Sequence, residues 1–406
     1  MTTALVDNRV LSMVERRLRD AEAPFNLRLW NGKGFSPAAP SPVTLTVNSR
    51  QALINLARPS LGKLAKSYVE GEIDLEGNFR DVLRVGESLV ARQHSVYHAR
   101  SHAWKWWRHS RAADRRSIEH HYDVGNKFYE LWLDRNCIYS CAYFKQPEDS
   151  LELAQEQKLE HVCRKLMLKP GDRFLDIGCG WGGLVLWAAR HYGVNALGIT
   201  LSREQFEGAR ARIQAAGLAD RCEVRLQDYR DMADRERFDK IASVGMFEHV
   251  GKRNLPVYFE KIQRLLVPGG LVLNHGITTN SLQEAQLGGG IGEFVDEYVF
   301  PGGELMHVAT VIEQMSRQGL EVWDAECLRP HYARTLWHWV DRLEARRDEA
   351  RALVGEKRLR TWLIYMAGSA HAFARGWISI YQLLGIRRQA SGAVAYPATR
   401  AHMYMT

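Results

Sequence analysis

A glycine-rich turn preceded by an acidic residue is the strongest chemical signal in this chain of 406 residues. The stretch FLDIGCGWGG covers residues 174–183, where an apolar run leads into Asp176 and a helical pattern follows from Leu184. Gly178 and Gly180 can adopt backbone angles closed to other residues, so a ligand can approach the main chain. Free amides at the helix start favour a polar or anionic ligand group. The turn therefore predicts a ligand site between a strand and a helix.

The order of residues in this turn favours S-adenosylmethionine (SAM) over a dinucleotide. A dinucleotide site has the form GxGxxG, with glycines placed for a pyrophosphate. Here the order is DxGxGxGG, the form found in SAM methyltransferases, where it holds an amino-acid carboxylate and a ribose. The turn alone leaves one alternative open, a glycine turn without a ligand in another kind of α/β protein.

Further chemical side chains follow the other strands expected for the same sheet. In an open parallel sheet, ligands bind beyond the carboxyl ends of the strands. Thr200 and Leu201 follow the strand expected at 195–200, where many nucleotide folds carry an acid for the ribose and this chain has none. Asp228 and Tyr229 follow the next strand, and they suit the amino group and the ring of an adenine.

Glu248 and His275 follow the fourth and fifth expected strands, which would place a carboxylate and an imidazole beside the cofactor. Such a pair beside a sulfonium indicates that a proton is removed during the reaction, and either residue suits the role of base. Taken singly, Glu248 also suits a carboxylate at a helix start, and His275 suits a buried histidine with satisfied hydrogen bonds. Their joint position favours a catalytic role.

A second polar cluster lies upstream, in the segments HYDVGN at 121–126 and YSCAYF at 139–144. We expect these segments to form a lid over the carboxyl edge of the sheet. Cys141 suits a nucleophile, a metal ligand or a core residue. A metal ion would need more ligands than this cluster offers, so we expect no metal site.

Strand and helix patterns alternate from Arg173 onward, and this alternation predicts a doubly wound, mostly parallel, Rossmann-like α/β sheet. The strand candidates are residues 173–177, 195–200, 223–227, 240–244 and 271–275. The helical patterns are residues 184–191, 203–216 and 255–266. After Gly276 the regularity lapses, and we expect helical C-terminal additions from Trp337 to about Leu384.

Residues 1–90 indicate a small α+β domain. The expected strands lie at 26–30 and 43–47, and helices begin near Arg50 and Leu61. Residues 91–117 form a basic, tryptophan-rich linker. Basic residues mixed with tryptophan suit a membrane interface, and the alternative is a solvated helix whose tryptophans pack on a neighbouring domain. A nucleic-acid partner is not expected, because no recognised binding module accompanies the charge.

Composition narrows the cellular setting. The net charge of +8 points to anionic partners. The six cysteines are scattered without a CxxC pair, which argues against a zinc knuckle or a disulfide framework and fits a reducing cytoplasm. The chain contains no run of 18 apolar residues, so the sequence predicts no transmembrane span. Residues 1–20 lack the apolar stretch of a secretory signal.

Seven ordered blocks resemble the cyclopropane-fatty-acyl-phospholipid synthases and the related mycolic-acid cyclopropane synthases. The blocks are HYDVGN, YSCAYF, LDIGCGWGG, GITLSREQ, GMFEHVG, FPGG and HYARTLWHW. The resemblance implies a SAM-dependent methyltransferase domain over 118–400. Residues 1–90 resemble the lipid-binding domain that the bacterial phospholipid enzymes carry, with 91–117 as the linker between the two.

The resemblance implies transfer of a methylene from SAM to a cis double bond of a phospholipid acyl chain. Methyl transfer to the alkene produces a carbocation, and a bound bicarbonate removes the proton that closes the ring. Glu248 and His275 would then orient the bicarbonate and would not themselves be the base. The implied bicarbonate site is Cys141, Glu248, His275, Tyr332 and the backbone at Val244, a position that is commonly Ile in the family. The predicted cofactor site is Tyr139, Ser140, Asp176, Gly178, Gly180, Thr200, Leu201, Gln205, Asp228 and Tyr229.

Three alternatives to a cyclopropane synthase stay open at the sequence level. One is a related enzyme that leaves a methyl- or methylene-branched acyl chain. Another is a small-molecule N-methyltransferase of the alkaloid type, which shares the Glu–His pair. The third is a catalytically silent lipid-binding protein. For partners, we expect unsaturated phospholipid and anionic lipid at the inner face of the membrane, in a cytoplasmic protein. The resemblance also suggests a homodimer.

Overall fold

The computed structural model describes residues 11–16, 24–37, 40–57, 59–90, 124–282 and 290–404, with the backbone of 97–98 and 286–287. The predicted linker at 91–117 therefore lies almost wholly outside the described residues, as does the start of the HYDVGN block. The chain divides into two compact units. The first unit contains residues 1–100, 285–301 and 343–372, and the second contains residues 101–284, 302–342 and 373–406.

The first unit is built on a mixed sheet of the order β2-β1-β3-β4. Its strands are β1 (Asn26–Leu29), β2 (Gly34–Phe35), β3 (Thr44–Val47) and β4 (Ile73–Glu76), and a separate pair is β5 (Tyr97–His98) with β11 (Gln286–Leu287). Leu27, Leu29, Leu45 and Val47 are buried and alternate with more exposed residues, the pattern of strands that bury one face. The helices of this unit are α2 (Arg50–Ala57), α3 (Leu61–Val69), α4 (Phe79–Val90), α11 (Ile291–Tyr298), α14 (Arg347–Val354) and most of α15 (Glu356–Ala374).

Polar contacts explain why two later segments join the N-terminal residues in the first unit. Arg360 of α15 donates to Asp74 Oδ1 at 2.6 Å and to the carbonyl oxygens of Tyr68 and Ile73 at 3.1 and 3.2 Å. Tyr298 of α11 donates to Glu70 at 2.7 Å. The sequence predicted a continuous domain over 1–90, whereas the compact unit also takes in α11 and α15, because these contacts join residues that are far apart in the chain.

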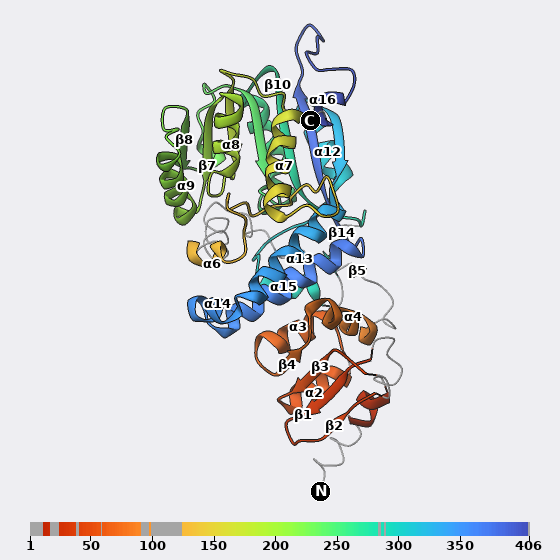
Figure 1. Cartoon of the computed structure of the whole chain (residues 1–406). Coiled ribbons are helices and arrows are strands. Elements are labelled where there is room, and N and C mark those ends of the chain that lie inside the picture. The colour runs from red at the N-terminus through yellow and green to blue at the C-terminus, as the bar shows by residue number, and fades with distance from the viewer. Residues whose placement is uncertain are drawn as a thin grey trace. The chain divides into compact units, whose positions relative to one another are not determined.

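The second unit contains a mostly parallel sheet of the order β13-β14-β10-β9-β6-β7-β8, which confirms the predicted fold class (Figure 1). Its strands are β6 (Arg173–Ile177), β7 (Asn195–Thr200), β8 (Cys222–Leu226), β9 (Phe238–Val244), β10 (Leu266–Thr279), β13 (Leu320–Cys327) and β14 (Ile378–Arg387), and the short β12 (Met306–His307) pairs with β10. The helices are α6 (Asn126–Glu130), α7 (Leu151–Lys165), α8 (Gly183–Tyr192), α9 (Arg203–Ala215), α10 (Leu255–Leu265), α12 (Val308–Arg317), most of α13 (Arg329–Ala345) and α16 (Ala401–Tyr404), with 3₁₀ turns η1 (Tyr229–Asp231), η2 (Phe247–His249) and η3 (Lys252–Asn254).

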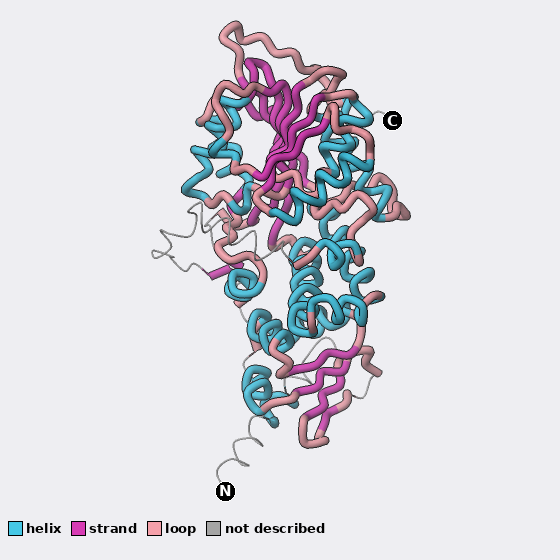
Figure 2. The backbone as a smooth tube through the Cα atoms, turned by 90° about the vertical axis from the view of Figure 1, so that its left-hand side faces the viewer, coloured by secondary structure: helices cyan, strands magenta, loops and turns pink. Residues whose placement is uncertain are grey.

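Helices cover both faces of this sheet, as Figure 2 shows. One apolar core lies between the sheet and α7, α8 and α9, and it includes Phe174 and Ala242. The other lies between the sheet and α10 and α12, and it includes Leu175 and Ile241. Neighbouring residues of one strand thus enter opposite cores, as expected for a parallel sheet buried on both faces.

The strand order reverses between β6 and β9, where β7 and β8 lie on one side and β10 on the other. Ligands of open α/β sheets bind at such a reversal, beyond the carboxyl ends of the strands. The five predicted strands are all present, and β6 and β7 begin and end at the predicted residues.

The prediction of a helical C-terminal part as far as Leu384 is wrong from Ile378 onward. Residues 378–387 form β14, which pairs antiparallel with both β10 and β13. The strand is buried along most of its length because it lies inside the sheet, so its residues lack the alternation that marks a strand in sequence. The same fold extends β10 to Thr279, so His275 lies within that strand and not at its tip.

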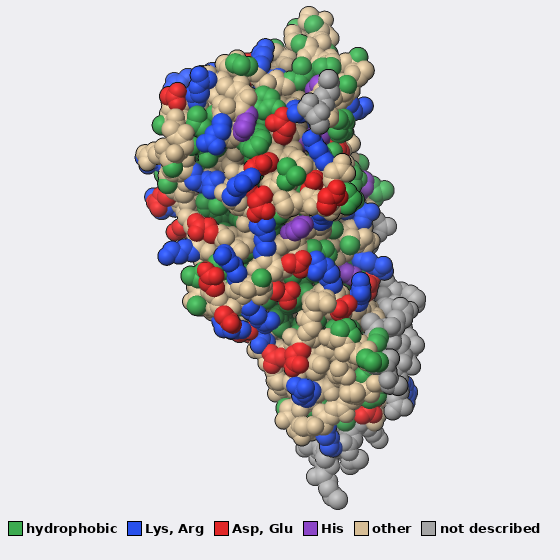
Figure 3. Space-filling view, in the orientation of Figure 1, with side chains coloured by type: hydrophobic (Ala, Val, Ile, Leu, Met, Phe, Trp, Pro, Cys, Tyr) green, Lys and Arg blue, Asp and Glu red, His purple; other side chains and the backbone are tan. Residues whose placement is uncertain are grey.

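The surface carries charges of both signs. Lys and Arg side chains are interspersed with Asp and Glu on the face that Figure 3 shows. Elsewhere in the second unit, charged side chains pair, such as Arg225 with Glu223 at 2.6 Å and Lys261 with Asp234 at 2.6 Å. Among the described residues, no helix is long and apolar enough to cross a membrane.

Two glycines of the first unit give a stability prediction. A Cβ at Gly62 in α3 would overlap the backbone of Gly290, whereas at Gly86 in α4 it would meet only Leu61 Cδ2, at an ordinary 3.5 Å. We expect Gly62→Ala to lower the free energy of unfolding by about 1–3 kcal/mol. The matched variant Gly86→Ala should raise it by about 0.5–1 kcal/mol through helix propensity. Urea unfolding of both variants checks this, and equal effects would contradict the close contact at Gly62.

Candidate active site

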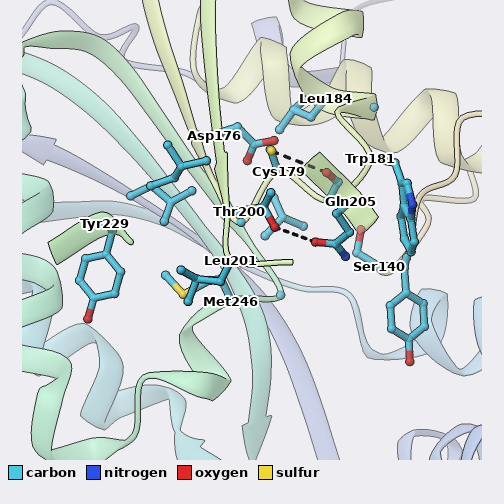
Figure 4. Close-up of a pocket in the computed structure, with 18 of the residues that line it drawn as sticks. Ser140, Asp176, Cys179, Trp181, Leu184, Thr200, Leu201, Gln205, Tyr229 and Met246 are labelled. Atoms are coloured by element: carbon cyan, nitrogen blue, oxygen red, sulfur yellow. Dashed lines mark hydrogen bonds between the residues drawn. The ribbon is translucent and has the colours of Figure 1, made fainter. Parts of the chain in front are cut away.

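A pocket lies at the carboxyl ends of β6, β7, β8 and β9 in the second unit (Figure 4). Every residue of the predicted cofactor site lines it: Tyr139, Ser140, Asp176, Gly178, Gly180, Thr200, Leu201, Gln205, Asp228 and Tyr229. Val244 lines it as well. The other predicted catalytic residues, which are Cys141, Glu248, His275 and Tyr332, are not among the lining residues.

The glycine turn folds back from β6 towards β7. Gly178, Gly180 and Gly182 have φ angles of 80°, 54° and 78°, which side chains rarely tolerate. The amides of Gly178 and Cys179 donate to the carbonyl oxygen of Ile199, at 2.9 and 3.0 Å. The turn is therefore anchored on β7, and α8 begins directly behind it.

The end of β7 positions an amide for a ligand. Thr200 Oγ1 donates to Gln205 Oε1 at 2.8 Å, the contact drawn in Figure 4. Ser202 Oγ accepts from the Gln205 amide at 3.2 Å and caps α9. Because the side-chain oxygen of Gln205 accepts a hydrogen bond from Thr200, the Nε2 group of Gln205 is left to donate to a ligand. A donor suits the hydroxyl oxygens of a ribose at the position where many nucleotide folds carry an acid and this chain has none.

Asp228 is less available than the sequence predicted. Arg230 binds its carboxylate in a forked contact, with Nε at 2.9 Å from Oδ1 and Nη2 at 2.6 Å from Oδ2. A carboxylate has further lone pairs, so a contact with the amino group of adenine stays a prediction. The ring of Tyr229 lies across the pocket from Ser140 in Figure 4, so these two residues mark its opposite ends.

Lys158 also lines the pocket, and the sequence did not single it out. It is buried in α7 and donates to Ser140 Oγ at 2.9 Å. Burial lowers the pKa of Lys158 to about 8, while the charges of Asp134, Cys141 and Asp176 oppose that shift. The signal that could have identified Lys158 is its place on the same face of α7 as Ala154, Gln155 and Leu159, which are buried.

Asp176, the acid before the glycine turn, is buried and also lines the pocket. Burial raises its pKa to about 7, and the charge of Lys158 opposes this rise. Asp176 Oδ1 has no hydrogen-bond partner within the described part of the chain. A buried acceptor without a partner is costly, and the ammonium group of the amino-acid end of SAM fits it.

Glu248 lies in η2, pressed against β10. Its Oε1 accepts from the Ile277 amide at 2.7 Å, and Oε2 has no partner among the described residues. Burial raises the pKa of Glu248 to about 7. A Cβ at Gly276 would overlap the Phe247 ring and come within 3.2 Å of Glu248 Oε1, so the glycine permits this close approach.

His275 faces the α7 side of the sheet and is fully buried. It is paired in register with Val244 of β9 on one side and Gln382 of β14 on the other. Burial lowers its pKa well below the usual value, and the charges of Lys158 and Lys165 act in the same direction. The imidazole is therefore neutral at physiological pH, and its Nε2 has no partner among the described side chains and backbone.

Cys141 and Tyr332 are brought together through the backbone of Leu328. The Cys141 thiol donates to the carbonyl oxygens of Ala142 at 3.2 Å and Leu328 at 3.8 Å, and the Tyr332 amide donates to the same Leu328 oxygen at 3.1 Å. Burial raises the pKa of the Cys141 thiol far above its usual value. A protonated thiol is a poor nucleophile, so Cys141 suits a hydrogen-bond donor.

The YSCAYF segment is anchored to its neighbours by buried hydrogen bonds. Gln155 of α7 donates to the Ser140 carbonyl at 2.9 Å, and the Ala142 amide donates to Thr335 Oγ1 of α13 at 3.0 Å. These contacts hold Tyr139 and Ser140 at the pocket. Among the described residues, no group of three or more His, Cys, Asp or Glu side chains suits a metal ion.

Comparison with known proteins assigns the chain to a family. The family model of the mycolic acid cyclopropane synthetases matches residues 109–383. The chain belongs to this family.

Individual relatives of this family cover different shares of the chain. Over 401 residues, the chain is 44% identical to a probable fatty acid methyltransferase of Pseudomonas putida, covering 97% of this chain and all of that protein. It is 38% identical over 272 residues to the cyclopropane-fatty-acyl-phospholipid synthase of Escherichia coli K12, covering 67% of this chain and 68% of that one. The crystal structure of mycolic acid cyclopropane synthase CmaA1, complexed with SAH and CTAB, matches 67% of this chain and 98% of its own with a TM-score of 0.63 and 33% identity.

Family membership establishes a SAM-dependent methyltransferase, as the sequence predicted. The pocket fits SAM on structural grounds as well, because it joins a glycine turn, a buried carboxylate oxygen that has no partner among the described residues, and an apolar end at Leu201 and Tyr229. The individual roles assigned to the predicted site residues stay predictions.

Lys158 gives a prediction about cofactor recognition. We expect Lys158→Met to weaken binding of S-adenosylhomocysteine about 10- to 100-fold, because a charged hydrogen bond at the amino-acid end is lost. Binding of 5′-methylthioadenosine, which lacks the amino-acid end, should change less than about twofold by the same reasoning. Calorimetric titration of both ligands measures the ratio of the two affinities.

Lys165→Met is the matched control for Lys158→Met. Lys165 is a buried lysine of the same helix, but it pairs with Glu326 at 2.6 Å and does not line the pocket. Its loss should lower stability and leave the ratio of the two affinities unchanged. Equal weakening of both ligands by Lys158→Met would mean that the residue only supports the fold.

Glu248 gives a prediction about pH and stability. Its pKa is raised from 4.5 to about 7, so the folded protein binds this proton more tightly than the unfolded chain does. Its stabilising contribution is complete below about pH 4.5 and is lost as the pH rises through about 7. We expect Glu248→Gln to remove this loss, so that its stability relative to the parent protein increases by about 2–3 kcal/mol between pH 4.5 and 8. Urea unfolding at several pH values tests this, and a constant difference would contradict the raised pKa.

Proposed function

We propose that the protein is a cyclopropane fatty acid synthase, which transfers a methylene from SAM to a cis double bond of phospholipid acyl chains. The observation that carries the proposal is a pair of buried polar atoms without a hydrogen-bond partner among the described residues, His275 Nε2 and Glu248 Oε2. Methyl transfer to an acceptor that is already nucleophilic needs little acid–base help, and the N-methyltransferase alternative, which shares the Glu–His pair, would differ by acting on a soluble amine. A reaction through a carbocation needs a group that removes a proton, away from bulk water.

The proposed reaction follows from the weak nucleophilicity of an alkene. SAM, when bound, supplies an electrophilic methyl group on its sulfonium. The S–CH₃ bond breaks as a C–C bond forms to the alkene, which leaves S-adenosylhomocysteine and a carbocation on the acyl chain. Loss of one proton from the transferred carbon then leaves the electron pair that closes the ring.

The donor set at the second polar site suits a small oxyanion such as bicarbonate, which would supply the base. Cys141 keeps its thiol proton because burial raises its pKa, and Glu248, with a pKa near 7, carries a proton in part of the molecules at neutral pH. We propose that these groups, with His275, Tyr332 and the backbone at Val244, hold the anion. Neutral His275 brings no positive charge that would repel the carbocation.

A fatty-acyl methyltransferase that leaves a methyl- or methylene-branched chain is the second candidate. The relative of Pseudomonas putida that spans 97% of the chain is named a probable fatty acid methyltransferase. Both candidates share methyl transfer to the alkene and differ in the fate of the carbocation. The carbon environment of the product distinguishes them.

For the partner and location, we propose unsaturated phospholipid at the cytoplasmic face of the membrane, with preference for anionic surfaces. The support is the net charge of +8 and the similarity to the phospholipid enzyme of Escherichia coli. A homodimer is a further proposal, which light scattering on the full chain can test.

The test of function uses the full chain, SAM with a ¹³C-labelled methyl group, and vesicles of a cis-monounsaturated phospholipid with and without an anionic lipid. We expect the label in a ring methylene by NMR, faster turnover on anionic vesicles, and a rate that falls when bicarbonate is removed. Glu248→Gln and Cys141→Ser should lower turnover about 10- to 100-fold with little change in SAM binding, because each alters the length or the donor group of a hydrogen bond to the anion.

Cys163→Ser serves as the control, because Cys163 is a buried cysteine of α7 outside the pocket. It should retain turnover near that of the parent protein. Label in a methyl branch or an exocyclic methylene would favour the second candidate. An unchanged turnover rate without bicarbonate would contradict the proposed role of a bound oxyanion as the base.

A further inference from the structure

A row of side chains crosses the sheet at the level of His275. In register, Val244 of β9 pairs with His275 of β10, His275 pairs with Gln382 of β14, and Gln382 pairs with Glu326 of β13. Gln382 and His275 are both fully buried. The row therefore connects a predicted site residue to a strand that the sequence did not reveal.

The contact within this row decides where His275 carries its proton. Gln382 Nε2 lies 3.2 Å from His275 Nδ1. In this orientation of the Gln382 amide its nitrogen donates, which makes Nδ1 the acceptor and places the single proton of the neutral imidazole on Nε2. That nitrogen has no partner among the described residues, so its N–H is left for a ligand.

The surroundings of Gln382 keep its amide for His275. The other polar neighbour in the row, Glu326, is already bound by Lys165 at 2.6 Å and by His161 Nε2 at 2.7 Å, both on α7. Asp324 of the same strand is bound by Lys165 and Arg400. The carboxylates near Gln382 are thus paired with cations, and they do not depend on its amide nitrogen.

We propose that Gln382 is a positioning residue that holds His275 in the Nε2–H form, so that His275 donates a hydrogen bond to the anion at the second polar site and does not act as a base. The inference rests on the proposed function for the identity of that anion. The assignment of the proton rests only on the contact between Gln382 and His275, so the two can fail separately.

The direct test is the protonation pattern of His275 in the full chain labelled with ¹⁵N-histidine. The two ring nitrogens give distinct NMR shifts when protonated or bare, and His275→Asn identifies the signals by their absence. We expect a protonated Nε2 and a bare Nδ1 in the parent protein. Gln382→Glu should reverse the pattern, because a carboxylate accepts from Nδ1–H. A parent protein with the proton on Nδ1 would overturn the proposal.

Gln382→Met is the second variant, since Gln382→Glu adds a carboxyl group beside Glu326 and can impair folding. It keeps a similar volume without a donor, so the His275 signals should show a mixture of the two forms. With bicarbonate present, we expect turnover about 10- to 100-fold lower, and binding of S-adenosylhomocysteine within about twofold of the parent protein. An unchanged His275 pattern in this variant would also overturn the proposal.

Ser379→Ala is the control, because Ser379 is buried in the same strand and its hydroxyl lies 3.2 Å from Cys327 Sγ, not at His275. It should leave the His275 signals unchanged. If the parent enzyme proves independent of bicarbonate while the NMR pattern is as expected, the proposed base is wrong and the role of Gln382 stands.

Discussion

Desolvation of a few ionisable side chains is the constraint on which the second unit depends. Lys158, Asp176, Glu248 and His275 are all buried around one end of the sheet. Burial shifts the pKa of each towards its neutral form, down for the lysine and histidine and up for the two acids. Such groups persist in a fold when a ligand completes their hydrogen bonds or when the reaction uses them.

The sheet supplies the positions that these groups need. The cofactor pocket lies at the strand reversal between β6 and β9, and β14 pairs with β10 along the segment that contains His275. Two helices complete the arrangement, because α7 carries Lys158 to Ser140 and α13 carries Tyr332 to the carbonyl that also binds Cys141. The helix α7 packs in the core on one face of the sheet and η2 packs in the core on the other face. The sheet itself therefore joins the residues around the pocket.

Local pattern was sufficient for the parallel part of the sheet and for the cofactor pocket. Residues of the glycine turn, the strand ends at Thr200 and Asp228, and Tyr139 and Ser140 of the YSCAYF segment line the pocket as predicted. Pattern failed where a strand is enclosed, because β14 is buried on both faces and lacks the alternation of a half-exposed strand. At Asp228 the pattern found a pocket residue but did not reveal that Arg230 pairs with its carboxylate.

By itself, the sequence determined the cofactor class, the fold class and the family, because glycine geometry, strand periodicity and ordered motifs are local properties of the chain. The tertiary structure decided which polar groups lose water and which contacts they keep. Lys158 became a pocket residue because it lies on the buried face of α7, and Gln382 reached His275 because β14 inserts beside β10. Burial and register join residues more than a hundred positions apart, and no local pattern encodes such a pairing.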